Sequence, residues 1–493
     1  MIDTTTPAPV LGHLIGGAES LGNRTFAVHN PSRIEERVGV VTDGTAADAV
    51  AAVDAAAIAA AGWAKTSVEE RIERLRRIAA AVDASAERLI DLATRENGSI
   101  AATIRREVGA SAGSFRDVAD YLAAALAPTT IQGGTAGEFV RVDRRPYGVV
   151  ACIVPWNAPV LLTANKLAPA IAAGNAVVLK PSPFAPLAVA LLAELAAGEL
   201  PPGVVNIVHG EAEVVRALVD DPRVRKISFT GGGATARHIM RQAADSLLPV
   251  HFELGGNDPA VVLEDADLAT SVERIVLSAY RRAGQVCFAT KRVYVQRSIA
   301  DEFRRLLLEH VDAMRVGDAQ DERASMGPVN NRGQLERVRG LLERARAAGR
   351  DVRVLGSKLD PGTWDDGYFL LPAVVLDAEQ DDEIVREEQF GPILPIIVCD
   401  SEEEAIAFAN DTDYGLCSSV WSRNHDHALA VASQIEAGVT FVNSAMFSAT
   451  GTREIPMGGW KQSGIGWEGS PFGIDEYLQF HSTDVQALPA ESA

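Results

Sequence analysis

Short apolar runs alternate with helical segments between residues 148 and 255, and this alternation constrains the fold more than any other feature. The apolar runs are VVACIV, AVVLK, VVNIV, KISF and VHFEL. Helical patterns fill the stretches between them, at 160–173, 186–198, 211–219 and 234–247. Repeated right-handed βαβ units of this kind build a parallel sheet with helices on both faces. Residues 148–255 therefore predict the core of a doubly wound α/β domain.

Polar side chains and glycines follow the predicted strands, where ligands of such sheets bind. They are Pro155, Trp156 and Asn157, then Lys180 and Ser182, then Thr230, Gly231 and Gly232, and finally Glu253 and Leu254. We expect these residues to meet at one edge of the sheet.

The flanking regions predict further elements. Alanine-rich 48–61 and the segment 67–95 read as helices, and Ser67 with Glu70 forms a capping box at the start of the second. After Gly256, helices at 269–282, 299–316 and 332–348 and strands near 371–375 and 392–398 predict a second α/β domain that shares the crevice with the first. Residues 477–480 read as an edge strand.

Charge and cysteine content exclude several classes of function. The chain has 46 Lys and Arg against 66 Asp and Glu, a net charge of −20, which argues against nucleic acid or a membrane surface as the main partner. Its four cysteines lack metal-site or disulfide spacing, so no metal is predicted. No secretory signal or run of 18 apolar residues is present, so we expect a cytoplasmic protein.

The turn after KISF is a candidate phosphate site. Gly231, Gly233 and Ala236 satisfy G-x-G-x-x-A between a strand and a helix, where backbone N–H groups can hold a pyrophosphate. A tight turn without a ligand explains the same glycines. Lys180 could pair with a ribose hydroxyl or a phosphate, or be a solvated charge.

Three residues have side chains suited to catalysis, each with an ordinary alternative. Cys287 has small, polar neighbours and could be a nucleophile, although lone cysteines such as Cys152 and Cys399 are usually buried apolar residues. Glu253 could be a general base of raised pKa, or a strand end that faces solvent. Asn157 could donate to an oxyanion or cap a helix.

The motif EEQFGP offers a further pair, because Glu388 and Phe390 could face a sugar and a ring, or form a simple turn. Taken in order, VPWNAP, VVLKPSP, ISFTGG, FELGG, GQVC, EEQFGP and PMGGWKQSGIG strongly resemble the aldehyde dehydrogenase superfamily, over residues 25–480. The resemblance implies the hydrolytic reaction. A cysteine thiolate attacks the aldehyde, a hydride passes to NAD(P)+, and water hydrolyses the thioester.

The resemblance also implies an arrangement of the chain and roles for its residues. It implies a dinucleotide-binding domain from 1–127 and 146–255, a catalytic domain from 256–456, and a small oligomerisation β-element from 128–145 and 474–493. Cys287 is the implied nucleophile and Glu253 the base, Asn157 and the Cys287 N–H form the oxyanion hole, and Lys166 lies near the active site. The implied cofactor contacts are Val154, Pro155, Trp156, Lys180, Ser182, Pro183, Thr230, Gly231, Gly232, Leu254, Glu388 and Phe390.

Two positions depart from the family pattern. Pro183 stands where many NAD-preferring relatives carry a glutamate that repels the 2′-phosphate of NADP, so NADP is possible although NAD is favoured. Gly232 replaces a serine, which removes one hydroxyl contact to phosphate.

The substrate and the partners are inferred from the same resemblance. Leu162, Phe288 and Phe447, with Trp156 and Asn165, would line a tunnel for an apolar or aromatic aldehyde. The loop 444–455 carries Arg453 and Glu454 and leaves room for a polar substrate end. Residues 141–147 and the strand near 477 would pair subunits into a homodimer or homotetramer. The alternatives are a non-catalytic binding or structural protein of the same fold, and a redox-free acyl transferase or hydrolase.

Overall fold

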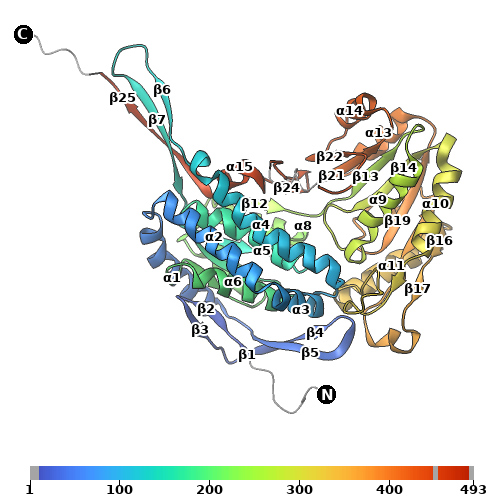
Figure 1. Ribbon diagram of the computed structural model, residues 1–493, viewed down its shortest axis with the longest axis horizontal. Coiled ribbons are helices and arrows are strands. Elements are labelled where there is room, and N and C mark those ends of the chain that lie inside the picture. The colour runs from blue at the N-terminus through green and yellow to red at the C-terminus, as the bar shows by residue number, and fades with distance from the viewer. Residues whose placement is uncertain (1–9, 448–453, 488–493) are drawn as a thin grey trace, which may run out of the picture.

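The computed structural model describes residues 10–447 and 454–487 as two lobes, with a β-sheet arm that projects from the first lobe (Figure 1). The first lobe contains an eight-stranded sheet of order β24-β12-β11-β8-β9-β10-β2-β3. Its parallel strands are β8 (Val149–Ile153), β9 (Ala176–Lys180), β10 (Val205–Ile207), β11 (Val224–Thr230) and β12 (Val250–Glu253). Antiparallel strands flank them, namely β2 (His13–Ile15), β3 (Ala18–Ser20) and β24 (Gly464–Ile465).

The order of these strands creates a topological switch point. The chain runs outward from β8 through β9 to β10 and then returns to the other side of β8 to form β11 and β12. The predicted doubly wound parallel sheet is therefore confirmed. Ligands of such sheets bind beyond the carboxyl ends of the strands at this reversal, here between β8 and β11.

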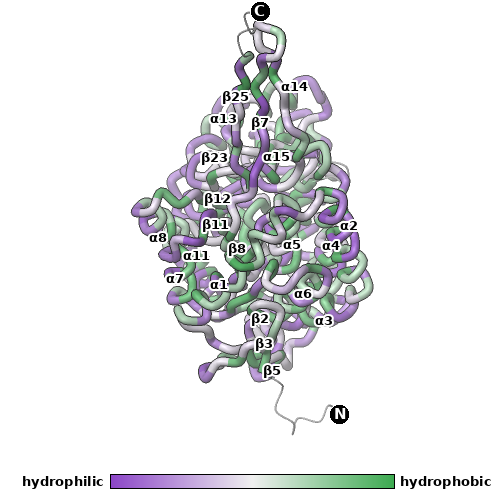
Figure 2. Tube along the Cα trace, turned by 90° about the vertical axis from the view of Figure 1, so that its left-hand side faces the viewer, coloured by the Kyte–Doolittle hydropathy of each residue, from purple (hydrophilic) through white to green (hydrophobic). Residues whose placement is uncertain are grey.

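Helices cover both faces of this sheet because successive side chains of a strand point to opposite sides. Val150 and Cys152 of β8 pack under α2 to α6, and Val149 and Ala151 pack under α1, α7 and α8. Figure 2 shows the apolar stretch of β8 inside the lobe. The helices are α1 (Ala46–Trp63), α2 (Val68–Ala84), α3 (Ala86–Asn97), α4 (Ala101–Ala125), α5 (Pro159–Ala172), α6 (Leu187–Gly198), α7 (Ala212–Asp220) and α8 (Gly233–Ala244).

The single helix expected over 67–95 is wrong, because two helices, α2 and α3, occupy this segment. Ser85 leaves helical geometry between them, as serine does when it competes for backbone hydrogen bonds. The capping box is half formed. The side chain of Ser67 accepts from the N–H of Glu70, without the reciprocal bond. Helix α4 was not anticipated from the sequence.

Helix α1 is the one helix in the described part of the chain that is long and apolar enough to cross a membrane, by length and composition alone. Its side chains Ala49, Val53 and Ala56 are buried in the core beneath β8 and β9. The apolar residues of α1 therefore form part of the packed core of the first lobe.

The second lobe is a seven-stranded sheet of order β16-β18-β19-β14-β13-β21-β22, so the predicted second α/β unit is present. All its strands are parallel except β16. They are β13 (Asp258–Val262), β14 (Thr290–Gln296), β16 (Asp351–Val354), β18 (Ala373–Leu376), β19 (Ile393–Cys399), β21 (Cys417–Trp421) and β22 (Val439–Val442). The helices of this lobe are α9 (Leu268–Tyr280), α10 (Ala300–Asp312), α11 (Arg332–Ala347), α12 (Glu383–Arg386), α13 (Glu402–Asn410) and α14 (His425–Ala432).

The arm is a three-stranded antiparallel sheet of β6 (Thr129–Gln132), β7 (Phe139–Pro146) and β25 (Leu478–Val485). Strand β25 pairs with β7 along its whole length, from Leu478 opposite Pro146 to Val485 opposite Phe139, and forms the expected edge strand. Figures 1 and 2 show the arm standing clear of the body. Its side chains Ile131 and Phe480 are 56% and 65% exposed, and the Arg144 guanidinium lies 5.3 Å from the centroid of the Phe480 ring, so the arm presents apolar surface to solvent.

Short elements complete the fold. A sheet of order β1-β5-β4, from β1 (Val10–Leu11), β4 (Thr25–Asn30) and β5 (Arg33–Thr42), lies beside the first lobe. Two-residue strands pair as β15 (Arg315–Val316) with β17 (Ser357–Lys358) and as β20 (Tyr414–Gly415) with β23 (Trp460–Lys461), and α15 (Ser470–Gly473) precedes β25.

Candidate active site

Four predicted site residues meet at the carboxyl edge of the first sheet. Lys180 lies opposite Ile153 of β8, and Thr230 lies opposite Glu253 in the register of β11 and β12. Asn157 follows β8 after four residues. All of these polar side chains are buried, so the alternatives of a solvated Lys180 and of a solvent-facing Glu253 are wrong.

The two glycines after Leu254 bring this edge against the second lobe. A Cβ at Gly255 would lie 2.2 Å from Oε2 of Glu388, and one at Gly256 would lie 2.7 Å from the carbonyl oxygen of Cys287. The N–H of Gly256 donates to Oε1 of Glu388 at 3.2 Å. Only glycine allows so close an approach. The motifs FELGG, GQVC and EEQFGP therefore meet in one place.

Asn157 reaches the backbone next to Cys287. Its Nδ2 donates to the carbonyl oxygen of Gln285 at 3.1 Å. The N-cap of α5 is Ala158, without a side-chain hydrogen bond, so the helix-cap interpretation of Asn157 is wrong. An amide nitrogen carries two hydrogens, and one of them stays available to a second acceptor.

A strained turn presents Cys287. Arg282, Ala283 and Gly284 have φ values of +54°, +53° and +73°, a region that residues with side chains seldom adopt. The guanidinium of Arg282 holds this turn by donating to the carbonyl oxygen of Asn157 at 3.0 Å and to Oε2 of Glu107 at 2.5 Å. These contacts fix the position of the cysteine from both lobes.

Cys287 is half-buried and is a thiol at rest. Burial, which outweighs the opposing charge of the Lys291 ammonium, and to a smaller extent the charge of Glu253 raise the pKa of the Cys287 thiol to about 12. Lys291 Nζ donates to the carbonyl oxygens of Cys287 and Gly256 and to Oε1 of Glu388, each at 3.0 Å. Lys291 therefore links the segments that carry Cys287, Gly256 and Glu388.

Burial, and then the nearby Glu468, raise the pKa of the Glu253 carboxyl well above its ordinary value. Oε1 of Glu253 lies 3.7 Å from Nε2 of His251, and neither atom has a hydrogen-bond partner among the described residues. Burial lowers the pKa of His251 well below the ordinary value, so this imidazole is neutral.

A polar network lies behind Glu253. Lys166 forms a buried ion pair with Glu468 and donates to Oγ of Ser228 at 3.2 Å. Oγ of Ser228 contacts Nδ1 of His251 and the hydroxyl of Tyr477, both at 3.0 Å. The sequence predicted Lys166 and missed the other members. His251 could have been found, because it precedes Glu253 by two residues on one strand and so shares its face.

The turn after β11 can hold a phosphate. A Cβ at Gly231 would strike the Phe229 ring at 2.4 Å, whereas Gly232 has open space around it and is the N-cap of α8 without a capping side chain. Oγ1 of Thr230 is buried without a hydrogen-bond partner in the described structure. Free N–H groups at a helix N-terminus and an unsatisfied hydroxyl match the oxygens of a pyrophosphate.

The end of β9 carries the remaining predicted contacts to adenosine. Burial lowers the pKa of Lys180 to about 8, and Glu211 opposes this shift. Oγ of Ser182 accepts from the N–H of Phe184 at 3.3 Å, and the N–H of Val154 donates to the carbonyl oxygen of Lys180 at 3.0 Å. Pro183 follows Ser182 and brings no carboxylate to this edge.

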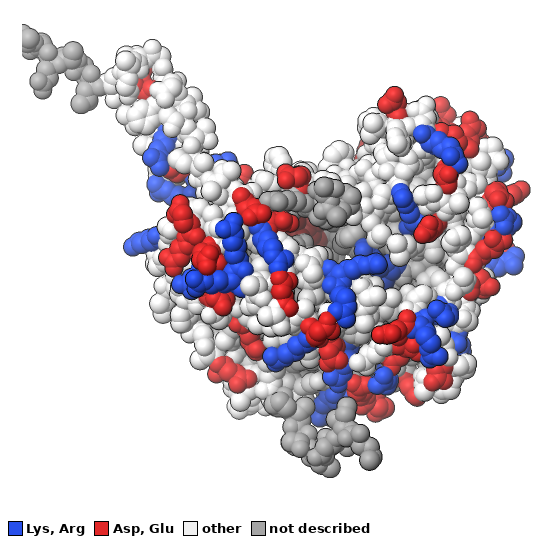
Figure 3. Space-filling model, in the orientation of Figure 1, with Lys and Arg blue, Asp and Glu red and all other residues white. Residues whose placement is uncertain are grey.

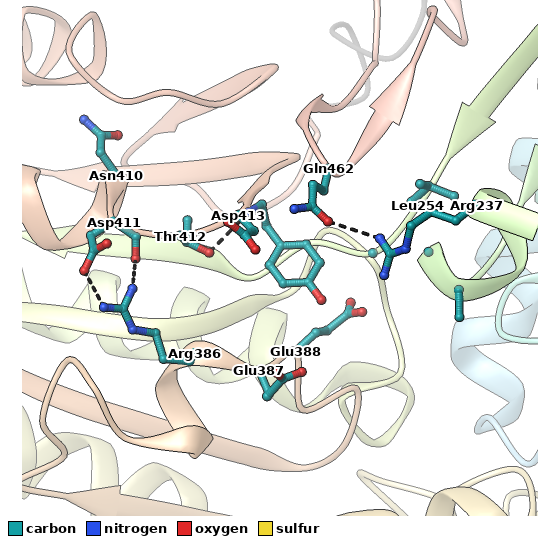
Figure 4. A pocket seen from close by; sticks show the side chains of 14 residues that line it. Arg237, Leu254, Arg386, Glu387, Glu388, Asn410, Asp411, Thr412, Asp413 and Gln462 are labelled. Carbon is teal, nitrogen blue, oxygen red and sulfur yellow. Dashed lines mark hydrogen bonds and ion pairs between the residues drawn. The ribbon is translucent and has the colours of Figure 1, made fainter. Parts of the chain in front are cut away.

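A pocket of about 530 Å³ opens between the lobes (Figure 4). Leu254 and Glu388, both predicted cofactor contacts, line it, together with Gly233 at the start of α8 and Tyr414 of the second lobe. Arg237 reaches across and donates to Oε1 of Gln462 at 3.1 Å. Both lobes therefore contribute to one polar cavity beside the phosphate-binding turn.

Aromatic side chains border the site on two sides. Trp156 and Phe390 contact edge to face at 5.6 Å, and Phe390 has a φ of +46°. Phe288 and Phe447 contact at 5.6 Å, within an apolar cluster that also includes Cys287. Leu162 is half-buried on α5, Pro155 is half-buried after β8, and residues 448–453, which include Arg453, lie outside the described residues.

Comparison with known proteins agrees with this arrangement. The family model for the aldehyde dehydrogenase family matches residues 18–483. Lactaldehyde dehydrogenase of Escherichia coli K12 is 38% identical over 472 residues, which cover 94% of this chain and 96% of the relative.

Two solved structures are similar over nearly the whole chain. The NAD-dependent aldehyde dehydrogenase of Sinorhizobium meliloti has a TM-score of 0.93 and 32% identity, and the match covers 98% of this chain and 97% of that one. 3,6-Anhydro-L-galactose dehydrogenase in complex with NADP has a TM-score of 0.92 and 32% identity, and covers 97% and 100% respectively. The chain belongs to the aldehyde dehydrogenase family and is an NAD(P)-dependent oxidoreductase that acts on an aldehyde.

Proposed function

We propose that the protein oxidises its aldehyde to the free carboxylic acid, through a thiohemiacetal and a thioester on Cys287. The observation that carries this proposal is the convergence of three groups distant in sequence. The Gly255–Gly256 turn after Glu253 touches the backbone of Cys287, and the amide of Asn157 donates to the carbonyl two residues before that cysteine.

The residues present fit the dinucleotide that the family uses. The N-terminus of α8 with Thr230 and Gly231 would hold the pyrophosphate, Lys180 and Ser182 the adenosine ribose, and Glu388 the nicotinamide ribose, beside the rings of Trp156 and Phe390. When bound there, NAD(P)+ supplies a hydride acceptor for the reaction.

The first chemical step requires an anionic sulfur and an acceptor for the developing negative charge. Lys291 is the cation near Cys287 that favours the anionic sulfur, because its ammonium lowers the pKa of the thiol against the effect of burial. The free hydrogen of the Asn157 amide and the N–H of Cys287 would stabilise the oxyanion.

The later step is hydrolysis of the thioester by water that Glu253 deprotonates. Behind Glu253 lie neutral His251, with Nε2 at 3.7 Å from Oε1 of Glu253, and the Ser228–Lys166–Glu468 network, whose members are hydrogen-bonded or ion-paired to one another and hold this side of the site in place. A carboxylate base favours hydrolysis over transfer of the acyl group to another acceptor, so the product is the free acid.

Apolar and aromatic parts of the substrate would pack on Phe288, Phe447 and Phe441, whose rings lie in edge-to-face contact beside Cys287. The relatives act on lactaldehyde and on a sugar aldehyde, so small hydroxylated aldehydes belong in the same panel of test substrates.

Reduction of cofactor at 340 nm, with a panel of aldehydes, tests the mechanism. We expect Cys287→Ala to abolish reduction while NAD+ binding, followed by the quenching of tryptophan fluorescence, stays within about twofold. Turnover retained by Cys287→Ala would refute the nucleophile assignment. Consumption of aldehyde or ester without any change at 340 nm would instead support the redox-free alternative.

We also propose that the arm of β6, β7 and β25 pairs subunits into a dimer or tetramer, and that the protein works in the cytoplasm. The exposed side chains Ile131 and Phe480 on the projecting arm support the first proposal. The four free cysteines support the second. Replacing Phe480 with Glu should shift the sedimentation coefficient toward that of a smaller species.

A further inference from the structure

Arg281 is a cation beside the proposed nucleophile whose charge no described carboxylate pairs with. It follows α9, and its guanidinium carbon lies 5.4 Å from the centroid of the Phe288 ring. Its Nε is buried and has no hydrogen-bond partner among residues 10–447 and 454–487. A buried donor without an acceptor is costly, which indicates that a ligand satisfies it in the working enzyme.

Glu107 is the carboxylate whose charge acts on Arg281, but both of its oxygens already accept hydrogen bonds from other groups. Its Oε2 accepts from Arg282, and its Oε1 accepts from the N–H groups of Val160 and Leu161 at 2.8 and 3.1 Å. Burial lowers the pKa of Arg281 to about 10, so the side chain still carries its charge at neutral pH.

The surroundings of Arg281 are positive although the protein as a whole is strongly negative. Arg282 and Arg106 are the other cations whose charges act on Arg281, and Glu107 neutralises only the former. Figure 3 shows Lys and Arg side chains gathered along the hollow between the lobes. A net charge of −20 disfavours anions near the molecule as a whole, so this local positive charge distinguishes the surroundings of Arg281.

The aromatic rings and the Arg281 guanidinium together fit an elongated ligand. Phe288 contacts both the ring of Phe447 and the guanidinium of Arg281, and Cys287 precedes it in the chain. An aldehyde carbon placed at Cys287 would continue as a short apolar chain along the rings. A carboxylate at the far end of that chain would meet Arg281, whose planar fork can form two parallel hydrogen bonds to it.

We propose that Arg281 is a specificity-determining residue and that the preferred substrates are ω-oxo carboxylates, aldehydes with a carboxylate at the opposite end. The proposal rests on the oxidation of aldehydes at Cys287 and adds the class of substrate. It requires no co-reactant beyond NAD(P)+ and water.

The test compares acids with their methyl esters. We would measure kcat/KM for ω-oxo carboxylates of three to six carbons and for the corresponding ω-oxo methyl esters, with wild type, Arg281→Met, Arg281→Lys and Arg105→Gln. Arg105 is the matched control, because it is an exposed arginine of α4 whose charge is already paired with Glu87. Methionine keeps an unbranched side chain against Phe288 and removes only the charge.

We expect Arg281→Met to lower kcat/KM for the acids by about 10- to 100-fold, the range of a charge-assisted hydrogen-bond pair, and to change the values for esters by less than about threefold. Arg281→Lys should recover part of the loss, and Arg105→Gln should match wild type. As a readout independent of turnover, the Cys287→Ala protein with NAD+ should bind the product dicarboxylates measurably by calorimetry and lose that binding when Arg281 is also changed to Met.

Three results would overturn the inference. Wild type could oxidise esters as well as acids, which leaves the proposed function intact and removes the substrate class. Arg281→Met could lower turnover of acids and esters equally and slow alkylation of Cys287 by iodoacetamide, which would make Arg281 a thiolate-stabilising group. Absence of dicarboxylate binding to the Cys287→Ala protein would contradict the anion site directly. Failure of every aldehyde to reduce NAD(P)+ would refute the proposed function itself.

Discussion

Replacing Gly256 with alanine should damage catalysis more than it damages folding. An added Cβ would lie 2.7 Å from the carbonyl oxygen of Cys287, 2.4 Å from Oδ1 of Asp258 and 2.9 Å from the Cβ of Leu416. Ordinary contacts begin at 3.4 Å, so the Cys287 carbonyl must move by about 0.7 Å or the Gly256 segment must retreat by as much. Neither side can yield easily, because Lys291 bonds to both carbonyl oxygens.

A shift of this size at a reacting atom costs about 100-fold in rate, while overpacking costs about 1–3 kcal/mol of folding free energy. We therefore expect kcat to fall by about two orders of magnitude, with a small fall in the melting temperature. Gly62→Ala is the matched control, because Gly62 is exposed near the end of α1, a Cβ there meets no atom within 4 Å, and its φ is not positive.

Steady-state kinetics at 340 nm and thermal unfolding of both variants would measure these effects. The rate of alkylation of Cys287 reports whether the sulfur has moved. A Gly256→Ala protein whose kcat stays within threefold of wild type would refute the claim that these glycines set the distance between the lobes.

Three further predictions concern other parts of the site. Glu253→Gln should leave a stoichiometric burst of reduced cofactor followed by slow turnover. In wild type the slow step should accelerate as pH rises through the raised pKa of Glu253, because only the ionised carboxylate accepts a proton; a deacylation rate independent of pH would contradict this role. Pro183→Glu should lower kcat/KM for NADP by at least tenfold relative to NAD, through charge repulsion at the ribose, and unchanged cofactor ratios would show that this position does not select. Glu107→Gln should destabilise the protein by about 3–5 kcal/mol in denaturant unfolding, because the carboxylate partner of buried Arg282 is lost, and a change below 1 kcal/mol would show that the pair is dispensable.

The elements around the site were largely predictable. Strands β8 to β12 and helices α5 to α8 lie where the alternation of apolar runs placed them, because a strand buried on both faces must be apolar along its whole length. The break at Ser85 was not predictable, because neither proline nor glycine marks it. Strands β2 and β24 also escaped prediction, since two or three residues carry too little periodicity to identify a strand.

The residues of the site also fall into a group that the sequence identifies and a group that it does not. Cys287, Glu253 and Asn157 stand out by residue type and by local pattern, because a carboxylate that ends an apolar strand and a cysteine among small residues are unusual even in isolation. Glu468, Ser228 and Tyr477 carry no such local signal. They join Lys166 and His251 only because the segment after β24 folds back behind β12.

The linear order of residues determined the parallel sheet and the set of polar groups at its carboxyl edge, since periodicity and strand-end chemistry are local properties. The close approach of Gly256 to Cys287, the pairing of Glu107 with Arg282 and the absence of a carboxylate paired with Arg281 among residues 10–447 and 454–487 were decided by tertiary structure alone. Whether a charge is paired depends on distances between segments far apart in the chain, and no local pattern encodes them.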